Sequence, residues 1–215
     1  MSNLDFKIFN SAEQRNKALR EDLLDSLSSS YKFNLALSGG STPISFFDYM
    51  QSNPLNATKH WNVFWVDERM VSSTDERSNA KYPISTWIKN ETKAKSFPVD
   101  TSLSTAEQST INYRLVLESE CESQLDYIIL GMGSDGHTAS IFPANEESND
   151  SVFWCNHPTD GTQRISMNYN LLAKAKKLVL LIQGKQKRKI LEETSLDLPI
   201  HKLLKKTKIV CYYID

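Results

Sequence analysis

Residues 33–47 read FNLALSGGSTPISFF, and this stretch decides the fold. Phe33–Leu37 is an apolar run of strand length, and the small, polar segment Ser38–Pro43 follows it directly. The proline that ends this segment suits the first turn of a helix, and Phe46 and Phe47 give that helix an apolar face. We therefore expect a buried strand, a glycine-rich turn and a helix in immediate succession.

The same succession of strand and helix runs through the rest of the chain. Further apolar runs predict strands at Trp61–Val66, Tyr127–Leu130, Leu178–Ile182 and Ile209–Tyr213. Two capping boxes, Ser11–Gln14 and Ser104–Glu107, predict helix starts, and a further helix is expected near Gln186–Glu193. This alternation predicts an α/β fold: a single domain over residues 1–215, Rossmann-like and doubly wound, with a mostly parallel sheet and helices on both faces.

Composition restricts both the class of protein and its surroundings. Of the 215 residues, 40% are hydrophobic and 24% are charged, which is enough apolar material for a packed core. The formal net charge of −1 argues against a nucleic-acid partner, since such a partner needs a clustered basic surface. No apolar run approaches the roughly 20 residues that span a bilayer, and the N-terminus lacks a signal-peptide pattern, so we expect no membrane association.

The cysteines predict no metal site. Cys121, Cys155 and Cys211 are far apart and form no C-x-x-C pair, which indicates neither a zinc site nor a disulfide framework. A reducing, cytoplasmic setting is the simplest expectation. Nothing in the sequence requires a cofactor or an obligate protein partner.

The first of three polar motifs follows the strand at Phe33–Leu37. It consists of two glycines and three hydroxyl residues: Ser38, Gly39, Gly40, Ser41 and Thr42. The glycines let the backbone approach a ligand closely, and the following helix presents free amides and the positive end of its dipole. The motif is therefore a candidate phosphate site. The alternative is a tight structural turn in which Thr42 caps the helix.

The second motif is Asp67-Glu68-Arg69, directly after the strand expected at Trp61–Val66. Three adjacent charged residues at the end of a buried strand are costly unless they pair or meet a ligand. Arg69 suits bidentate binding of a phosphate or a carboxylate. The alternative is a surface turn whose charges pair with one another.

The third motif, Gly131–Thr138, again places a glycine-rich loop after a buried strand, and here Asp135 stands two residues before His137. Histidine titrates near neutrality and can accept a proton from water, and a neighbouring acid can fix its tautomer. Two potential ligands on one loop, without a second histidine cluster, do not make a zinc site. We expect no catalytic role for the histidines in ordinary polar contexts: His60, His157 and His201.

Together, these motifs resemble the signature segments of the 6-phosphogluconolactonases, in the family's order and at compatible spacing. The third match extends through Ala139–Pro143. Weaker matches are Arg164-Ile165-Ser166 and the G-x-x-K pattern of Gly184–Lys187. The resemblance covers about residues 33–193.

Two features depart from the family's pattern. Ala144 stands where the family often has glycine, and the chain is somewhat short. We expect the missing residues in the irregular stretch 144–163, which is predicted to form a long loop with a short strand around Val152–Cys155. These departures concern the loop that covers the substrate rather than the chemistry.

The resemblance implies metal-free hydrolysis of 6-phospho-D-glucono-1,5-lactone to 6-phosphogluconate, a step of the oxidative pentose phosphate pathway. In this scheme His137 is the general base that activates water, and Asp135 orients it. Arg69, or backbone amides of the loop Gly131–Gly136, would stabilise the tetrahedral oxyanion.

For binding, the resemblance implies that Ser38–Thr42 hold the phosphate of the substrate. Arg164 and Lys187 would be its cationic partners, and Asp67 would bind sugar hydroxyls. Spacing along the chain does not decide which cation faces the phosphate and which faces the reacting carbonyl.

Two alternatives remain open. A glucosamine-6-phosphate deaminase shares the phosphate loop and the D-G-H segment, but it resembles D-E-Y where this chain has Asp67-Glu68-Arg69. It also typically continues with an I-A-F-N-E-like run where this chain has Thr138–Pro143. A non-catalytic sugar-phosphate sensor would carry a helix-turn-helix segment, for which no residues are left over. We rank the lactonase above the deaminase and the sensor last.

Overall fold

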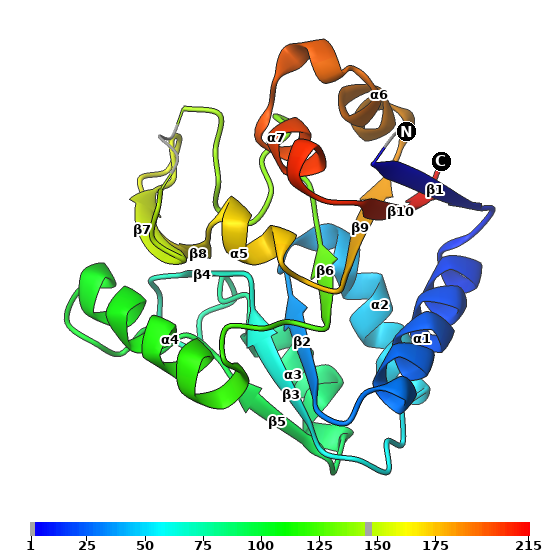
Figure 1. Ribbon diagram of the computed structural model, residues 1–215, viewed down its shortest axis with the longest axis horizontal. Coiled ribbons are helices and arrows are strands. Elements are labelled where there is room, and N and C mark those ends of the chain that lie inside the picture. Colours follow the sequence, from blue (N-terminus) through cyan, green and yellow to red (C-terminus); the bar gives the residue numbers. More distant parts are fainter. Residues whose placement is uncertain (1–2, 145–147) are drawn as a thin grey trace.

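The computed structural model describes residues 3–144 and 148–215, and within them the main sheet has seven strands (Figure 1). Their order across the sheet is β1-β10-β9-β6-β2-β3-β5, and every neighbouring pair is parallel. The strands are β1 (Leu4–Phe9), β2 (Phe33–Leu37), β3 (Trp61–Trp65), β5 (Ala94–Phe97), β6 (Tyr127–Leu130), β9 (Lys177–Gln183) and β10 (Ile209–Ile214). The predicted α/β class with a parallel sheet is confirmed. The two edge strands, β1 and β5, had no predicted counterpart.

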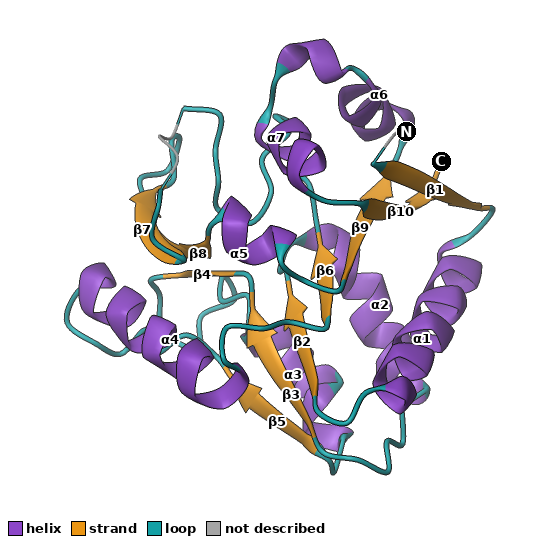
Figure 2. Ribbon diagram, viewed as in Figure 1, coloured by secondary structure: helices purple, strands orange, loops and turns teal. Residues whose placement is uncertain are grey.

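Helices cover both faces of this sheet (Figure 2). They are α1 (Ala12–Ser29), α2 (Ser41–Ser52), α3 (Lys81–Thr86), α4 (Ala106–Cys121), α5 (Tyr169–Ala173), α6 (Lys185–Glu192) and α7 (Pro199–Lys206), with short 3₁₀ helices at Ile88–Asn90 and Thr194–Leu196. One buried cluster joins the sheet to α1, α2 and the segment around Trp87. The other buried cluster joins the sheet to α4, α5, α6 and α7. No helix in the described residues is long and apolar enough to cross a membrane.

The inner strands are buried on both faces, which is why their sequences are apolar runs rather than alternating patterns. In β2, Leu35 and Leu37 pack into the cluster with α1 and α2. Ala36, between them, packs into the cluster on the opposite face. The register places Leu35 beside Val63 of β3 and Tyr127 of β6.

A second, smaller sheet was not predicted. It has the order β4-β8-β7, all antiparallel, with β4 (Asp67–Arg69), β8 (Gln163–Met167) and β7 (Val152–Asn156). Only β7 had been expected, as the short strand in the stretch 144–163. Three residues of that stretch, 145–147, lie outside the described residues.

The two predicted helix starts are found, one of them shifted by one residue. Ser11 caps α1, and its hydroxyl accepts the backbone N–H of Gln14 at 3.2 Å, as expected. For α4 the cap is Thr105 rather than Ser104, with the N–H of Gln108 donating to the Thr105 hydroxyl at 3.2 Å. The pattern therefore located the helix start correctly to within one residue.

The end of β3 depends on a side chain from α4. β5 pairs with β3 only as far as Phe64, so Trp65 has no ladder partner on that side. The hydroxyl of Tyr113 takes that place: it accepts the N–H of Trp65 at 2.8 Å and donates to the carbonyl of Trp65 at 2.7 Å. Tyr113 is 1% exposed, so water does not replace it. This contact fixes the point at which the chain leaves the main sheet for β4.

Replacing Tyr113→Phe keeps the ring and removes both hydrogen bonds. The N–H and carbonyl of Trp65 would remain buried without a partner, so we expect the free energy of unfolding to fall by roughly 1–3 kcal/mol. Urea denaturation measures this difference, with Tyr31→Phe at a 98% exposed position as the control. Equal stabilities of Tyr113→Phe and wild type would contradict the role of the hydroxyl.

Candidate active site

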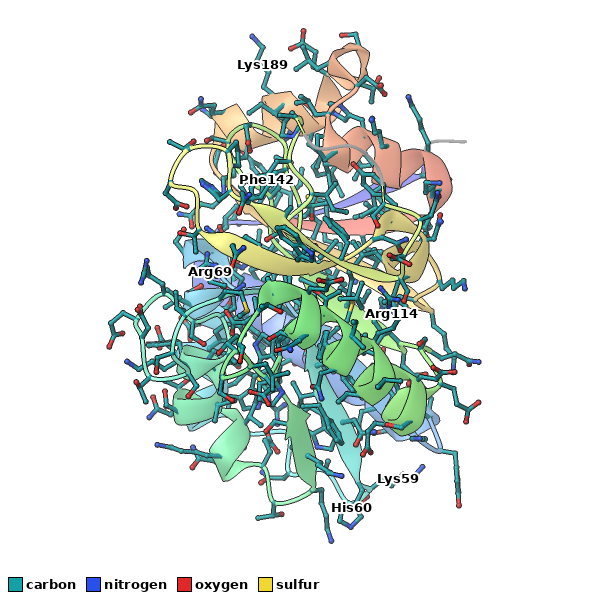
Figure 3. The ribbon with its side chains drawn as sticks, turned by 90° about the vertical axis from the view of Figure 1, so that its left-hand side faces the viewer. Lys59, His60, Arg69, Arg114, Phe142 and Lys189 are labelled. Atoms are coloured by element: carbon teal, nitrogen blue, oxygen red, sulfur yellow. The ribbon has the colours of Figure 1, made fainter. Side chains whose placement is uncertain are left out.

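A cavity of about 220 Å³ lies at the carboxyl ends of β2 and β6, beside the small sheet. All three predicted motifs contribute to its lining, together with side chains from β8 and α6. Figure 3 labels two of the lining residues, Arg69 and Phe142, in the region of the small sheet's yellow strands. The position agrees with the general rule that open parallel sheets bind ligands at the carboxyl ends of their strands.

The turn after β2 directs the start of α2 into this cavity. Gly40 is the N-cap of α2, with a φ of 94° that favours glycine, and no side chain caps the helix. The alternative in which Thr42 is the cap is therefore wrong. A Cβ on Gly39 would lie 1.8 Å from Oδ1 of Asn79, so only glycine fits there. The uncapped amides of a helix of 12 residues favour an anion at this point.

Asp67-Glu68-Arg69 forms β4, so its side chains alternate between two faces. Asp67 and Arg69 line the cavity, whereas Glu68 points away from it. Asp67 is 6% exposed, and its Oδ2 accepts a hydrogen bond from the hydroxyl of Ser140 at 2.7 Å. The interpretation of this motif as a surface turn is wrong.

The carboxylate of Glu68 is buried and binds the loop that follows β4. It accepts the backbone N–H groups of Arg69 at 2.7 Å, Asn79 at 2.7 Å and Ala80 at 2.9 Å, and the hydroxyl of Ser78 at 2.9 Å. Burial raises the pKa of Glu68, although these four hydrogen bonds oppose the shift. Glu68 therefore holds the backbone of the site and does not face the ligand space.

Two arginines place positive charge in the cavity. Arg69 of β4 and Arg164 of β8 are register partners, and the Nε atoms of both are buried without a hydrogen-bond partner in the described part of the chain. Burial lowers the pKa of Arg164, and the charge of Arg69 lowers it further. The carboxylate of Asp160 offsets the positive charge of Arg164 only from a distance, with its Oδ2 3.8 Å from Nη2 of the arginine. Buried, unpaired donors of like charge suit an anionic ligand.

Lys187 adds a third cation from the first turn of α6. Burial lowers the pKa of its ammonium group. Within the described ranges, no carboxylate oxygen pairs with its Nζ. The helix itself begins like α2, with a glycine N-cap (Gly184, φ 88°) and no side-chain cap. Lys187 is thus available to a ligand in the cavity that it lines.

Asp135 and His137 form a hydrogen-bonded pair. Nδ1 of His137 lies 2.6 Å from Oδ1 of Asp135, which also accepts the backbone N–H of His137 at 3.1 Å. Burial alone would raise the pKa of Asp135, but these interactions outweigh it and the pKa is lowered. A carboxylate at Nδ1 favours the tautomer that carries its proton there, which leaves a lone pair on Nε2. Nε2 has no hydrogen-bond partner among the described residues.

A glycine makes room for this pair. A Cβ on Gly133 would lie 2.3 Å from Cε1 and Nδ1 of His137 and 2.6 Å from Oδ1 of Asp135. The backbone of the loop is also engaged: the N–H of Gly133 donates to the carbonyl of His137 at 2.9 Å, and the N–H of Gly136 to the carbonyl of Gly133 at 3.2 Å. These two amides are therefore not free to bind an oxyanion.

The structure brings most of the predicted site residues to the cavity wall: Ser38, Gly39, Gly40, Ser41, Thr42, Asp67, Arg69, His137, Arg164 and Lys187. Asp135 reaches the cavity only through His137. His157, for which we expected no catalytic role, lines it as well. So do Asn79, which lies outside the motifs, and Phe142, which lies in the extended third match but had no predicted role. In residues 3–144 and 148–215, no group of three or more His, Cys, Asp or Glu side chains could hold a metal ion.

Comparison with known proteins gives consistent results. A sequence model described as glucosamine-6-phosphate isomerases/6-phosphogluconolactonase matches residues 10–210. The chain is 32% identical to a 6-phosphogluconolactonase of Helicobacter pylori, over 94% of this chain and 93% of that protein. The fold is similar to the crystal structure of a 6-phosphogluconolactonase from Shewanella baltica, with a TM-score of 0.85 and 24% identity over 99% and 98% of the two chains.

A monomeric glucosamine-6-phosphate deaminase also has this fold. It is 18% identical, with a TM-score of 0.80, over 98% of this chain and 97% of the deaminase. The fold therefore does not distinguish the two activities, and the side chains of the site have to do so.

Gly133→Ala should break the Asp135–His137 hydrogen bond, because the new methyl group would occupy the space of the imidazole. In wild type, NMR of the ring protons should show a strongly downfield proton on Nδ1 of His137, and the variant should lose it. Gly131→Ala is the control on the same loop, since its Cβ would meet only the carbonyl oxygen of Gly39, at 3.8 Å. A downfield proton retained in Gly133→Ala would contradict the expected displacement.

Proposed function

The chain belongs to the family of glucosamine-6-phosphate isomerases and 6-phosphogluconolactonases, and on this premise we propose that it hydrolyses 6-phospho-D-glucono-1,5-lactone to 6-phosphogluconate in the oxidative pentose phosphate pathway. One observation carries the proposal. The Asp135–His137 pair presents to the cavity a nitrogen that bonds no described residue, and the same cavity contains arginines and the start of a helix. Hydrolysis of an anionic lactone needs both a general base and an anion site.

The phosphate of the substrate binds at the start of α2. The hydroxyls and amides of Ser38–Thr42 donate hydrogen bonds to it, and Arg164 and Lys187 supply the opposite charge. Two observations support this placement of the phosphate. All of these groups line one cavity, and no side chain of the described residues caps the amides at the start of α2. Asp67, which also faces the cavity, accepts hydrogen bonds from sugar hydroxyls.

The reaction begins at Nε2 of His137. This nitrogen takes a proton from a water molecule, and the resulting hydroxide attacks the C1 carbonyl of the lactone. Asp135 stabilises the imidazolium that forms, as the acid does in hydrolase triads. Arg69 stabilises the negative charge on the carbonyl oxygen. Two amides of the neighbouring loop are already engaged: the N–H of Gly133 donates to the carbonyl of His137, and that of Gly136 to the carbonyl of Gly133.

Collapse of the tetrahedral intermediate breaks the bond between C1 and the ring oxygen. The imidazolium returns its proton to that oxygen, which becomes the 5-hydroxyl of 6-phosphogluconate. His137 is then neutral again and ready for the next turnover. Apart from the substrate and the water molecule, every group in the scheme belongs to the chain.

The lactonase is favoured over the deaminase by the sequences. Three solved structures of 6-phosphogluconolactonases are 20–24% identical to this chain, and the deaminase structure is 18% identical. Curated sequences named 6-phosphogluconolactonase reach 32% identity. The side chain at position 69 is an arginine, where the deaminase pattern resembles a tyrosine. An arginine there suits an oxyanion.

We place the enzyme in the cytoplasm and treat residues 1–215 as one catalytic domain. In the part of the chain that the structure describes, Cys121, Cys155 and Cys211 form no disulfide bond, as is usual in a reducing compartment. The two buried clusters lie on the two faces of one sheet, which supports a single domain.

Removal of the substrate's phosphate tests the anion site. Charged hydrogen bonds contribute about 1.5–3 kcal/mol each, so the loss of two or more should lower kcat/KM by a factor on the order of 10² or greater. The measurement compares glucono-1,5-lactone with its 6-phosphate, each corrected for spontaneous hydrolysis. Comparable kcat/KM values would mean that Ser38–Thr42 is only a structural turn.

Loss of the base tests the chemistry. His137→Ala should lower kcat by about 10²–10⁴-fold, the usual contribution of a positioned acid or base. His137→Asn should be similarly impaired, since an amide does not accept a proton from water at neutral pH. KM should change far less, because the phosphate is held by other residues. A folded His137→Ala enzyme with the turnover of wild type would overturn the assignment, and His60→Ala at an exposed position serves as the control.

A further inference from the structure

His157 is the second histidine of the cavity, directly after β7. Its ring meets Phe142 edge-on, with centroids 4.9 Å apart and an interplanar angle of 88°. His137 packs against the same phenyl ring, with centroids 5.0 Å apart and an angle of 57°. The two imidazoles therefore flank one aromatic ring, and all three side chains line the cavity.

The turn after β7 determines which nitrogen of His157 carries the proton. Nδ1 accepts the backbone N–H of Asp160 at 3.2 Å and that of Thr159 at 3.4 Å. The carboxylate of Asp160 also lies 3.3 Å from Nδ1, but this oxygen already accepts the N–H of Thr162 at 2.8 Å. A nitrogen that accepts two amides carries its lone pair there, so the proton of the neutral ring is on Nε2.

A histidine with a purely structural role looks different in this protein. His201 is 1% exposed, and both of its ring nitrogens are paired: Nδ1 accepts the N–H of Leu198 at 3.1 Å, and Nε2 meets the carbonyl of Ile190 at 2.9 Å. In His157 only Nδ1 is paired within the described residues, and 23% of the side chain is exposed. One side of the ring is held by the turn, and the other side is available to a ligand.

We propose that His157 is a substrate-binding residue whose Nε2–H donates a hydrogen bond to an oxygen of the bound sugar phosphate. The inference rests on the proposed function, since it concerns the same cavity. It adds an imidazole N–H donor to a site that also contains the cations Arg69, Arg164 and Lys187. The acceptor is an oxygen of the phosphate or of a sugar hydroxyl, and either can accept the Nε2–H.

Two substitutions separate binding from a structural role. The oxygen of asparagine in His157→Asn can replace Nδ1 in the turn, but nothing replaces Nε2. The amide of glutamine in His157→Gln reaches the position of Nε2 and gives up the contacts of Nδ1. If His157 binds substrate, His157→Asn should raise KM by roughly 3-fold or more, the effect of one lost hydrogen bond, with kcat nearly unchanged. His157→Gln should lie closer to wild type.

The matched control is His60→Asn. His60 is exposed, and Figure 3 shows it at the end of the molecule opposite Phe142, so its kinetics should equal those of wild type. The reverse order, with His157→Asn like wild type and His157→Gln impaired or unfolded, would show that His157 only supports the turn. That result overturns the inference and leaves the proposed function standing.

Binding of the product, measured by calorimetry with 6-phosphogluconate, tests His157 without turnover. A weaker Kd for His157→Asn than for wild type supports the inference even if wild type does not hydrolyse the lactone, an outcome that would refute the proposed function alone. Equal Kd values overturn the inference. Inorganic phosphate as a competitive inhibitor identifies the acceptor. Its inhibition constant rises in His157→Asn if Nε2 of His157 donates to the phosphate group of the substrate, and stays constant if Nε2 donates to a sugar hydroxyl.

Discussion

The buried carboxylate of Glu68 binds four donors, and the shape of the site follows from this contact. Side chains alternate along β4, so the fixed position of Glu68 on one face directs the side chains of Asp67 and Arg69 to the opposite face, where the cavity lies. The loop that Glu68 binds contains Asn79. The side-chain amide of Asn79 donates to the carbonyl of Asp67 at 2.9 Å, and Gly39 packs against the same side chain. One interior carboxylate thus links the small sheet to the turn that opens α2.

The fold was predictable where burial is two-sided. Phe33–Leu37 and Tyr127–Leu130 are strands with the bounds that their apolar runs predict, because both faces of these strands lie in the core. β1 (LDFKIF) is an edge strand with charged residues, and its pairing with β10 depends on residues at the far end of the chain. β4 consists of three charged residues and becomes a strand only through its partner β8. No local pattern reports such pairings.

The site was predictable for a similar reason. Loops that follow parallel strands meet at one edge of the sheet, so Ser38–Thr42 and His137 were expected to be neighbours, and both line the cavity. The opposite orientations of Glu68 and Arg69 were not expected, since they require the motif to be a strand. The position of His157 in the cavity wall was not predicted. It depends on the contact with Phe142 and on a turn whose backbone amides bind the ring, and the polar neighbours of His157 in the sequence indicate neither.

The pairing of β1 with β10 has a consequence for biosynthesis. Of the seven strands of the main sheet, β1 is synthesised before the others, yet its neighbour is β10, and Lys7 of β1 donates to the hydroxyl of Tyr212, 205 positions later. The strands from β2 to β9 can assemble around the central sheet while translation continues. β1 has no other strand neighbour in this sheet, so its backbone hydrogen bonds to the sheet form only after β10 has been synthesised.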